Sequence, residues 1–303
     1  MSAKRGTSGL CGVLLVDKPA GLTSHDVVDR VRRAAGERRV GHAGTLDPMA
    51  TGLLVVLVGP ATRLEPYLSA AEKGYVARID FGTATDTLDA EGEVTATCDV
   101  SDSVFNPEVA GKILDGLLGP SMQVPPAFSA IKKDGQVAHR VARAGGEVEL
   151  DARPIEVHAA RLLKVDPAAR TWTVDFIVSK GTYVRALARD IGIAAGTVAH
   201  LGALRRTASG RLSIDDALEL DSFTDAASVS GAFTDPVAAL GITQRRAATA
   251  DVDHGRAVAA EGVQTGTLVA MTEGAALKAV YRADGEMLRP LVVLPIPAAG
   301  GRS

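Results

Sequence analysis

Short apolar runs of strand length are scattered along the chain and separated by turn residues. Val13–Val16 is such a run, and Leu53–Val58 is another. Tyr75–Phe81 alternates apolar and polar residues, as a strand with one buried face does. Between the first two runs, Ser24 can cap an amphipathic helix that ends at Gly36. The first third of the chain therefore predicts strands with a helix between them.

The rest of the chain continues in strands and helices without a repeating order. Ile155–Val165 and Thr171–Ser179 have the pattern of two antiparallel strands joined by a turn, and Thr182–Ala195 has that of a helix. Because no strand–helix–strand unit repeats, we predict an α+β fold with a mixed, mainly antiparallel sheet. Further strands are expected at 247–252, 267–272, 277–282 and 288–294. We expect one domain over residues 1–240 and a small β-rich domain over 241–303.

The composition is that of a globular protein. The 303 residues are 46% hydrophobic and 23% charged, which excludes a wholly disordered chain. The two cysteines, Cys11 and Cys98, are too few for a disulfide framework or a four-cysteine zinc site. The apolar run Leu10–Val16 is too short for a membrane span and is followed by no signal-peptide cleavage site. We expect a cytoplasmic monomer that does not bind membranes.

Charge is distributed unevenly along the chain. The formal net charge is −3, which by itself argues against a nucleic-acid-binding protein. Residues 1–65, however, carry 9 basic and 6 acidic side chains, and residues 123–211 carry 14 and 8. Phosphate contacts need a local positive surface rather than a positive total. The two basic segments could form such a surface, or each could be an ordinary solvated face.

Several common catalytic signatures are missing from the sequence. It has no phosphate-binding loop, no dinucleotide fingerprint, no zinc-protease helix and no nucleophile elbow, and its histidines lack metal-ligand spacing. We therefore expect no metal and no cofactor. The most unusual stretch is Gly41–Gly52, which places His42 and Asp47 among glycines directly before an apolar strand. Such a loop can aim a carboxylate into a cleft, or it can be only a tight turn around Asp47.

The same stretch carries a resemblance to a known family. Gly41–Leu54 resembles the catalytic signature of the TruB-type pseudouridine synthases. Other stretches resemble the remaining blocks of that family in the same order: Gly59–Arg63, Lys73–Tyr75 with Gly82–Asp89, Gln123–Lys132, Lys180–Arg185 and His200–Thr207. The resemblance covers about residues 12–212, and it implies isomerisation of uridine to pseudouridine in RNA without a metal or cofactor.

The resemblance also implies roles for the residues of the site. Asp47 would be the catalytic residue, acting either as a nucleophile or as the base that removes a ribose proton. Arg185 would pair with Asp47 and keep it ionised, because a nearby positive charge lowers the pKa of a carboxylate. Tyr75 would stack on the target base after that base has left its own stack. These three residues form the predicted catalytic set.

Other residues would hold the substrate. Tyr183 resembles a second aromatic residue of the pocket, Leu204 an apolar wall and His42 a residue that helps displace the base. Leu204 could equally be a core residue, and His42 could only stabilise its loop. Residues 123–151 resemble the family's RNA-gripping thumb, and their basic side chains would contact phosphates. These side chains belong to Lys132, Lys133, Arg140 and Arg143.

The resemblance implies that the substrate is the T arm of tRNA, with the uridine at position 55 of the T loop as the target. His139 stands where relatives commonly have tyrosine, so an aromatic RNA contact there is in doubt. The C-terminal segment resembles a PUA-like RNA-binding domain only weakly. Two alternatives stay open: an RNA-binding or tRNA-folding protein whose isomerase site is idle, and a synthase that acts on another RNA uridine.

Overall fold

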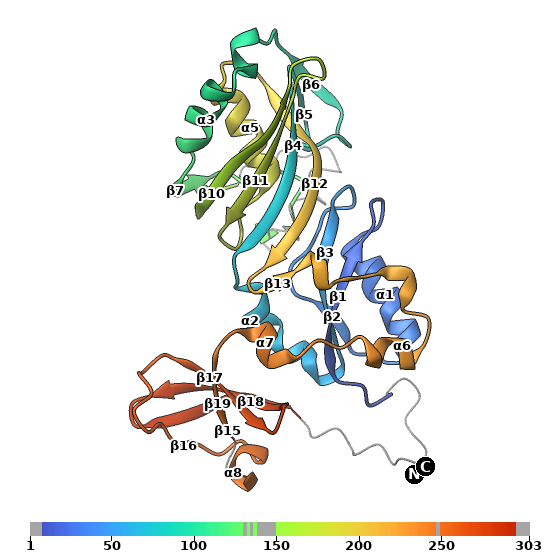
Figure 1. Cartoon of the computed structure of the whole chain (residues 1–303), viewed down its shortest axis with the longest axis vertical. Helices are drawn as coiled ribbons and strands as arrows, with labels where there is room; N and C mark the ends of the chain where they lie inside the picture. Colours follow the sequence, from blue (N-terminus) through green and yellow to red (C-terminus); the bar gives the residue numbers. More distant parts are fainter. Residues whose placement is uncertain (1–7, 130–131, 134–135, 138–149, 247–248, 295–303) are drawn as a thin grey trace. The chain divides into compact units, whose positions relative to one another are not determined.

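The chain forms two compact units, each described here by itself. The computed structural model describes residues 8–129, 132–133, 136–137, 150–246 and 249–294 (Figure 1). The first unit combines Met1–Pro48, Gly52–Ala71 and Ala208–Ser303, and the second combines Met49–Thr51 and Glu72–Thr207. No helix within the described ranges is long and apolar enough to cross a membrane.

The first unit is built on two antiparallel strands buried on both faces. β1 runs beside β3 with Gly12 opposite Val58 and Lys18 opposite Gly52, and β2 pairs with β3 as well. β14 adds a short parallel pairing to β1, and α1 and α6 are in contact. The elements are β1 (Gly12–Lys18), α1 (Ser24–Ala35), β2 (Val40–His42), β3 (Thr51–Val58), α2 (Glu65–Ser69), β13 (Leu212–Ser213), β14 (Leu218–Glu219), α6 (Ala226–Gly231) and α7 (Pro236–Leu240).

Helix α1 begins one residue earlier than the sequence pattern indicated. Thr23 is its N-cap, with a side chain that accepts a hydrogen bond from the backbone N–H of Asp26, and Gly36 ends it at φ +59°. The prediction that Ser24 is the cap is therefore wrong. Thr23 and Asp26 form a reciprocal capping box, which satisfies two N-terminal groups of the helix at once. Ser24 is buried, and its hydroxyl binds another segment.

The C-terminal part of the first unit is a five-stranded sheet in the order β15-β17-β18-β19-β16. Three of the four predicted strands are found, but the strand predicted at 247–252 is not: residues 249–253 form a helical turn. In that turn Val252 is buried while Ala250 and Asp251 are exposed, a pattern that a strand does not have. The elements are β15 (Thr243–Arg246), α8 (Thr249–Asp253), β16 (Val258–Ala259), β17 (Leu268–Glu273), β18 (Ala276–Asp284) and β19 (Met287–Val293).

One apolar core joins this C-terminal sheet to the rest of the first unit. Leu64 and Leu68, which follow β3, belong to the same buried cluster as Val237 of α7 and Val280 and Val292 of the sheet. A hydrogen bond from Arg63 to the carbonyl of Val293 adds a polar contact at 2.9 Å. The C-terminal sheet thus shares a core with the rest of the first unit and is not connected to it by the chain alone.

The second unit is a mainly antiparallel sheet whose described strands include β4, β11, β10 and β7 in that order. The helices α3 and α5 lie on the same side of this sheet in Figure 1. The elements are β4 (Lys73–Phe81), β5 (Thr83–Thr85), β6 (Val94–Thr97), α3 (Pro107–Asp115), β7 (Gly119–Gln123), β8 (Lys132–Lys133), β9 (Gln136–Val137), β10 (Arg153–Asp166), β11 (Thr171–Val178), α5 (Val184–Ala194) and β12 (Ala199–Ser209). The predicted α+β fold, with its mainly antiparallel sheet and β-rich C-terminal part, is confirmed.

Trp172 is fully buried at the centre of the second unit. Its ring contacts that of Phe81 edge to face at a centroid distance of 4.7 Å, and Phe81 in turn contacts Phe105 at 6.0 Å. The indole N–H donates a hydrogen bond of 3.2 Å to the carbonyl of Val104. A buried indole is favourable because its one donor has this acceptor.

Replacing Trp172 with phenylalanine should lower the free energy of unfolding by about 1–3 kcal/mol, because the buried carbonyl of Val104 loses its donor. The aromatic contact with Phe81 is kept by this substitution. Urea unfolding followed by circular dichroism measures the change without relying on the fluorescence of the chain's single tryptophan. An unchanged unfolding midpoint would show that the hydrogen bond contributes nothing.

Candidate active site

Asp47 lies on the loop between β2 and β3, and the backbone just before it is held in place. The N–H of Leu46 donates to the hydroxyl of Ser24 at 2.8 Å, and that hydroxyl donates to the carbonyl of Leu46 at 3.1 Å. The loop begins with a hydrogen bond of 2.9 Å from Ala43 to Val55 of β3. The loop is therefore tied to the start of α1 and to the sheet at once.

The backbone just after Asp47 is held by a buried lysine. Lys18, at the end of β1, is completely buried, and its ammonium group donates to the carbonyls of Pro19, Leu22 and Pro48 at 2.9, 2.7 and 3.2 Å. A buried ammonium is stable only when its donors are satisfied, so these three carbonyls become fixed relative to one another. The half-buried Asp47 thus stands between two anchored residues.

Arg185 is the buried cation of the second unit, with 5% of its surface exposed at the start of α5. Its guanidinium donates to the carbonyls of Thr87 and Phe128 at 2.9 Å each. It also forms an ion pair with Asp89 at 3.4 Å, in which both side chains are 6% exposed. An arginine in this position stays charged, so the carboxylate and the carbonyls compensate for the water that it has lost.

Asp89 is positioned by its own segment. One of its carboxylate oxygens accepts hydrogen bonds from the hydroxyl of Thr87 at 2.6 Å and from the N–H of Glu91 at 3.1 Å. Thr85 donates to the carbonyl of Asp89 at 2.7 Å. Asp89 was not among the residues predicted for the site, although it lies in a stretch that resembles the family. The Thr-x-Thr-x-Asp pattern, typical of side chains that bind a nearby carboxylate, was the available signal.

Tyr183 directly precedes α5, where a glutamine from β7 holds its backbone. The N–H of Tyr183 donates to the side-chain oxygen of Gln123 at 2.9 Å, and the side-chain nitrogen of Gln123 donates to the carbonyl of Tyr183 at 3.3 Å. Gln123 is buried. This two-way amide contact fixes the backbone of Tyr183, two residues before Arg185.

Tyr75 and Leu204 are each 8% exposed. Tyr75 lies on β4 opposite Phe176 of β11, and Leu204 lies on β12, where its carbonyl accepts a hydrogen bond from Thr51 at 3.5 Å. Small exposed fractions suit the wall of a narrow pocket, and they suit core residues equally well. The roles of both residues stay predictions.

Two further buried cations are Lys73, on the strand of Tyr75, and Arg206, on β12. Lys73 is two residues before Tyr75 and therefore shares its face of β4. Burial, together with the positive charge of the buried Arg206, lowers the pKa of Lys73 to about 8. The sequence analysis did not identify this pair.

The predicted residues divide between the two units. Tyr75, Tyr183, Arg185 and Leu204 belong to the second unit, and Asp47 and His42 to the first. His42 is half-buried at the end of β2, opposite Val56. The pairing of Asp47 with Arg185 stays a prediction. Of the thumb, Lys132 and Lys133 form the short strand β8, paired with β9 at 136–137, while Arg140 and Arg143 lie outside the described residues.

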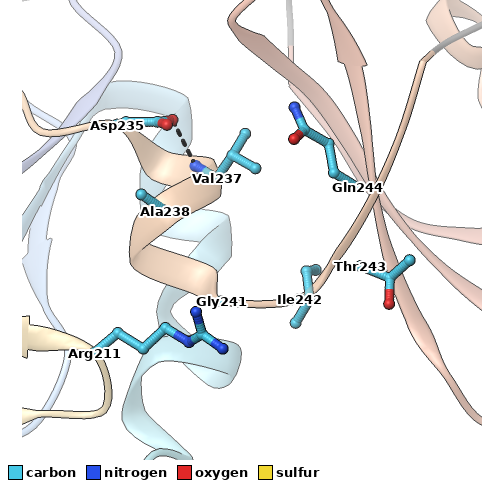
Figure 2. Close-up of a pocket in the computed structure, with 8 residues that line it drawn as sticks. All are labelled: Arg211, Asp235, Val237, Ala238, Gly241, Ile242, Thr243 and Gln244. Carbon is cyan, nitrogen blue, oxygen red and sulfur yellow. Dashed lines mark hydrogen bonds between the residues drawn. The ribbon is translucent and has the colours of Figure 1, made fainter.

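One hollow in the first unit contains none of these residues. It has a volume of about 470 Å³ and is lined by residues of α7, of the start of β15 and by Arg211 (Figure 2). The carboxylate of Asp235, which lines this hollow, accepts a hydrogen bond of 2.8 Å from the N–H of Val237 and so caps α7. Within the described residues, no cluster of histidine, cysteine and acidic side chains could hold a metal ion.

Comparison with known families assigns most of the chain. Residues 32–184 match the TruB family pseudouridylate synthase N-terminal domain, and residues 185–235 match the tRNA pseudouridylate synthase B C-terminal domain. The tRNA pseudouridine synthase B of Mycobacterium sp. (strain KMS) is 42% identical over 95% of this chain and 97% of its own length. The enzyme of the same name from Deinococcus radiodurans is 41% identical over 72% and 80%.

A solved structure shares the fold. The crystal structure of the archaeal box H/ACA sRNP Nop10-Cbf5 complex matches with a TM-score of 0.69 and 24% identity, covering 94% of this chain and 86% of the other. Together with the family matches, the fold and the site define a pseudouridine synthase, an isomerase that acts on RNA uridine. The chain belongs to the TruB family, as the resemblance in its sequence predicted.

Replacing Asp89 with asparagine should lower the free energy of unfolding by about 3 kcal/mol, because it removes a buried carboxylate that compensates the charge of the buried Arg185. Urea unfolding of the parent and the variant measures the difference. Asp80→Asn is the matched control: Asp80 pairs with Arg78 at 2.8 Å, but these side chains are 24% and 47% exposed. We expect the control to change stability by less than about 1 kcal/mol. Equal effects of the two substitutions would contradict a special role for Asp89.

Proposed function

We propose that this enzyme isomerises the uridine at position 55 in the T loop of tRNA. The observation that carries the proposal is the bracing of the Asp47 loop on both sides, by Ser24 at Leu46 and by Lys18 at Pro48. Such bracing holds a catalytic carboxylate near one geometry and so lowers the entropic cost of reaching the reactive arrangement. The names of the relatives, which specify tRNA, support this choice of substrate.

The reaction rearranges bonds without oxidation or net hydrolysis. The bond between N1 of uracil and C1′ of the ribose breaks, the base turns, and C5 bonds to C1′. The proton on C5 is lost and N1 gains one, so atoms and charge balance. Asp47 can take part as a nucleophile towards the ribose or as the base that removes a ribose proton, and both routes need an ionised carboxylate.

The remaining residues prepare the nucleotide for this step. Arg185 supplies the fixed positive charge that keeps Asp47 ionised. Tyr75 stacks on the extruded uracil and offsets part of the few kcal/mol that unstacking costs. Tyr183 and Leu204 form the rest of the pocket, and His42 helps to displace the base from the loop.

The rest of the RNA is held by phosphate contacts. The thumb, residues 123–151, supplies Lys132, Lys133, Arg140 and Arg143 to the T arm, and the enzyme works as a monomer. The shape and phosphates of a folded RNA are the features that such basic side chains recognise. Residues 1–240 form the catalytic domain, and residues 241–303 form a small PUA-like domain.

The direct test is incubation of the protein with an unmodified tRNA transcript, followed by mapping of any pseudouridine. We expect modification at position 55 by the parent and none by Asp47→Asn. The tRNA affinity of this variant should stay within about tenfold of the parent, because phosphate contacts dominate binding. Asp115→Asn, an exposed carboxylate at the end of α3, is the control and should act like the parent.

Three results would contradict the proposal in different ways. Modification at another uridine would overturn the choice of target. Tight tRNA binding by a parent that forms no pseudouridine would indicate an idle site. Turnover by Asp47→Asn would show that another residue performs the chemistry.

A further inference from the structure

Some of the cations on the described surface are neutralised by a neighbouring carboxylate. Arg78 pairs with Asp80 and Arg161 with Asp175, at 2.8 and 3.2 Å. The same holds for pairs throughout both units: Arg30–Asp221, Lys164–Asp166, Arg189–Asp190, Arg245–Glu261, Arg256–Asp251 and Arg289–Asp284. A cation paired in this way offers little net charge to an anionic partner.

The end of α1 gathers exposed cations that have no such ion pair among the described residues. Arg33 is in the last turn of the helix, and Arg38 and Arg39 follow its glycine cap, so that residues 30–39 carry five arginines and one glutamate. Arg33, Arg38 and Arg39 are exposed, and among the described residues none of their guanidinium groups has a hydrogen bond or an ion pair. We call these three residues the arginine cluster.

The backbone that carries the arginine cluster is fixed. The guanidinium of Arg32 donates to the carbonyls of Arg38 and Val40 at 3.2 and 3.4 Å. The carbonyl of Arg39 accepts from the N–H of Gly59 at 2.7 Å, and its own N–H donates to the buried Glu37 at 3.0 Å. The carboxylate of Glu37 thus binds the backbone of Arg39 rather than a guanidinium group of the arginine cluster. The fixed backbone keeps the three arginines at set positions on the surface. Such an arrangement suits recognition of a shaped partner better than a mobile tail does.

The surface beside the arginine cluster is hollowed. Arg30 and Arg33 line a hollow of about 390 Å³ together with residues 220–224, which precede α6. Arg30 is already neutralised there by Asp221 at 3.1 Å, whereas Arg33 is not. The uncompensated positive charge therefore lies at the C-terminal end of α1, whereas the N-terminal end carries Asp26 in its capping box.

The arginine cluster also lies close along the chain to the catalytic loop. Only β2, with three residues, separates Arg39 from the loop that carries Asp47. At about 3.3 Å per residue, this strand spans roughly 10 Å. A nucleic-acid backbone passes several phosphates over such a length. An RNA whose loop reaches Asp47 can therefore place the adjoining stem on the cluster.

We propose that Arg33, Arg38 and Arg39 form a second phosphate-contact surface for the substrate RNA, separate from the thumb. The inference rests on the proposed function for the identity of that RNA. Arginines suit this role because their guanidinium groups bind phosphate oxygens in pairs and stay charged. Basic residues also favour a helix C-terminus through the macrodipole, and that purely structural role would be seen in stability rather than in RNA binding.

The test compares two triple variants of the full chain. In Arg33→Gln/Arg38→Gln/Arg39→Gln the arginine cluster is neutralised. The control, Lys112→Gln/Arg170→Gln/Arg282→Gln, removes three other exposed cations that have no described partner and changes the net charge equally. Binding to an unmodified tRNA transcript is measured across salt concentrations, with thermal unfolding and the single-turnover rate at saturating tRNA measured alongside.

We expect the cluster variant to bind tRNA at least about tenfold more weakly in 0.1 M salt, with a salt slope less negative by about 2–3. Its unfolding temperature and saturated single-turnover rate should match the parent's, and the control should change affinity less than about threefold. Unchanged affinity and slope would overturn the inference and would mean that the cluster binds another protein or only solvent. Equal losses of affinity in both variants would overturn it as well. A parent that binds tRNA but forms no pseudouridine would count against the proposed function, while the binding comparison would still decide the role of the cluster.

Discussion

A buried cation must find oxygen acceptors to replace the water it has lost, and in each unit of this enzyme that requirement fixes segments beside residues predicted for the site. In the first unit Lys18 gathers three carbonyls, including that of Pro48 beside Asp47. In the second, Arg185 gathers two carbonyls and the carboxylate of Asp89. Because each cation binds segments far apart in the sequence, the loops around it have little freedom to move independently.

This arrangement separates the chemistry from the bulk of the RNA contact. The side chains proposed to touch the uridine are few and largely buried, whereas the arginine cluster, proposed to touch phosphates, is exposed and has no ion pair among the described residues. The overall charge of −3 hides that division, because some surface cations in the described regions are paired with local carboxylates whereas the arginine cluster is not. Recognition of RNA by such a chain depends on where charge is left uncancelled rather than on how much is present.

Sequence patterns predicted the features of the fold that depend on residues close together in the chain. The strands β1 and β3, the hairpin of β10 and β11, and the glycine that ends α1 follow from periodicity and local conformation. The patterns failed where short-range signals conflict: Thr23 rather than Ser24 caps α1, and residues 249–253 form a helical turn. They also missed Lys18 and Asp89, because their importance comes from partners distant in sequence, such as Pro48 and Arg185. The catalytic role of Asp47, predicted from its glycine-rich setting and the family resemblance, stays a prediction.

The measurement that tests this account most directly is the single-turnover rate of pseudouridine formation by Arg185→Lys, with tRNA affinity measured in parallel. Lysine keeps the positive charge but lacks the planar fork that binds two carbonyls and a carboxylate together. The account predicts a rate at least about a hundredfold below the parent's, equivalent to about 2.7 kcal/mol in the barrier, with affinity within about tenfold. A near-normal rate for Arg185→Lys would show that charge alone suffices and would contradict the central place given to the geometry of Arg185.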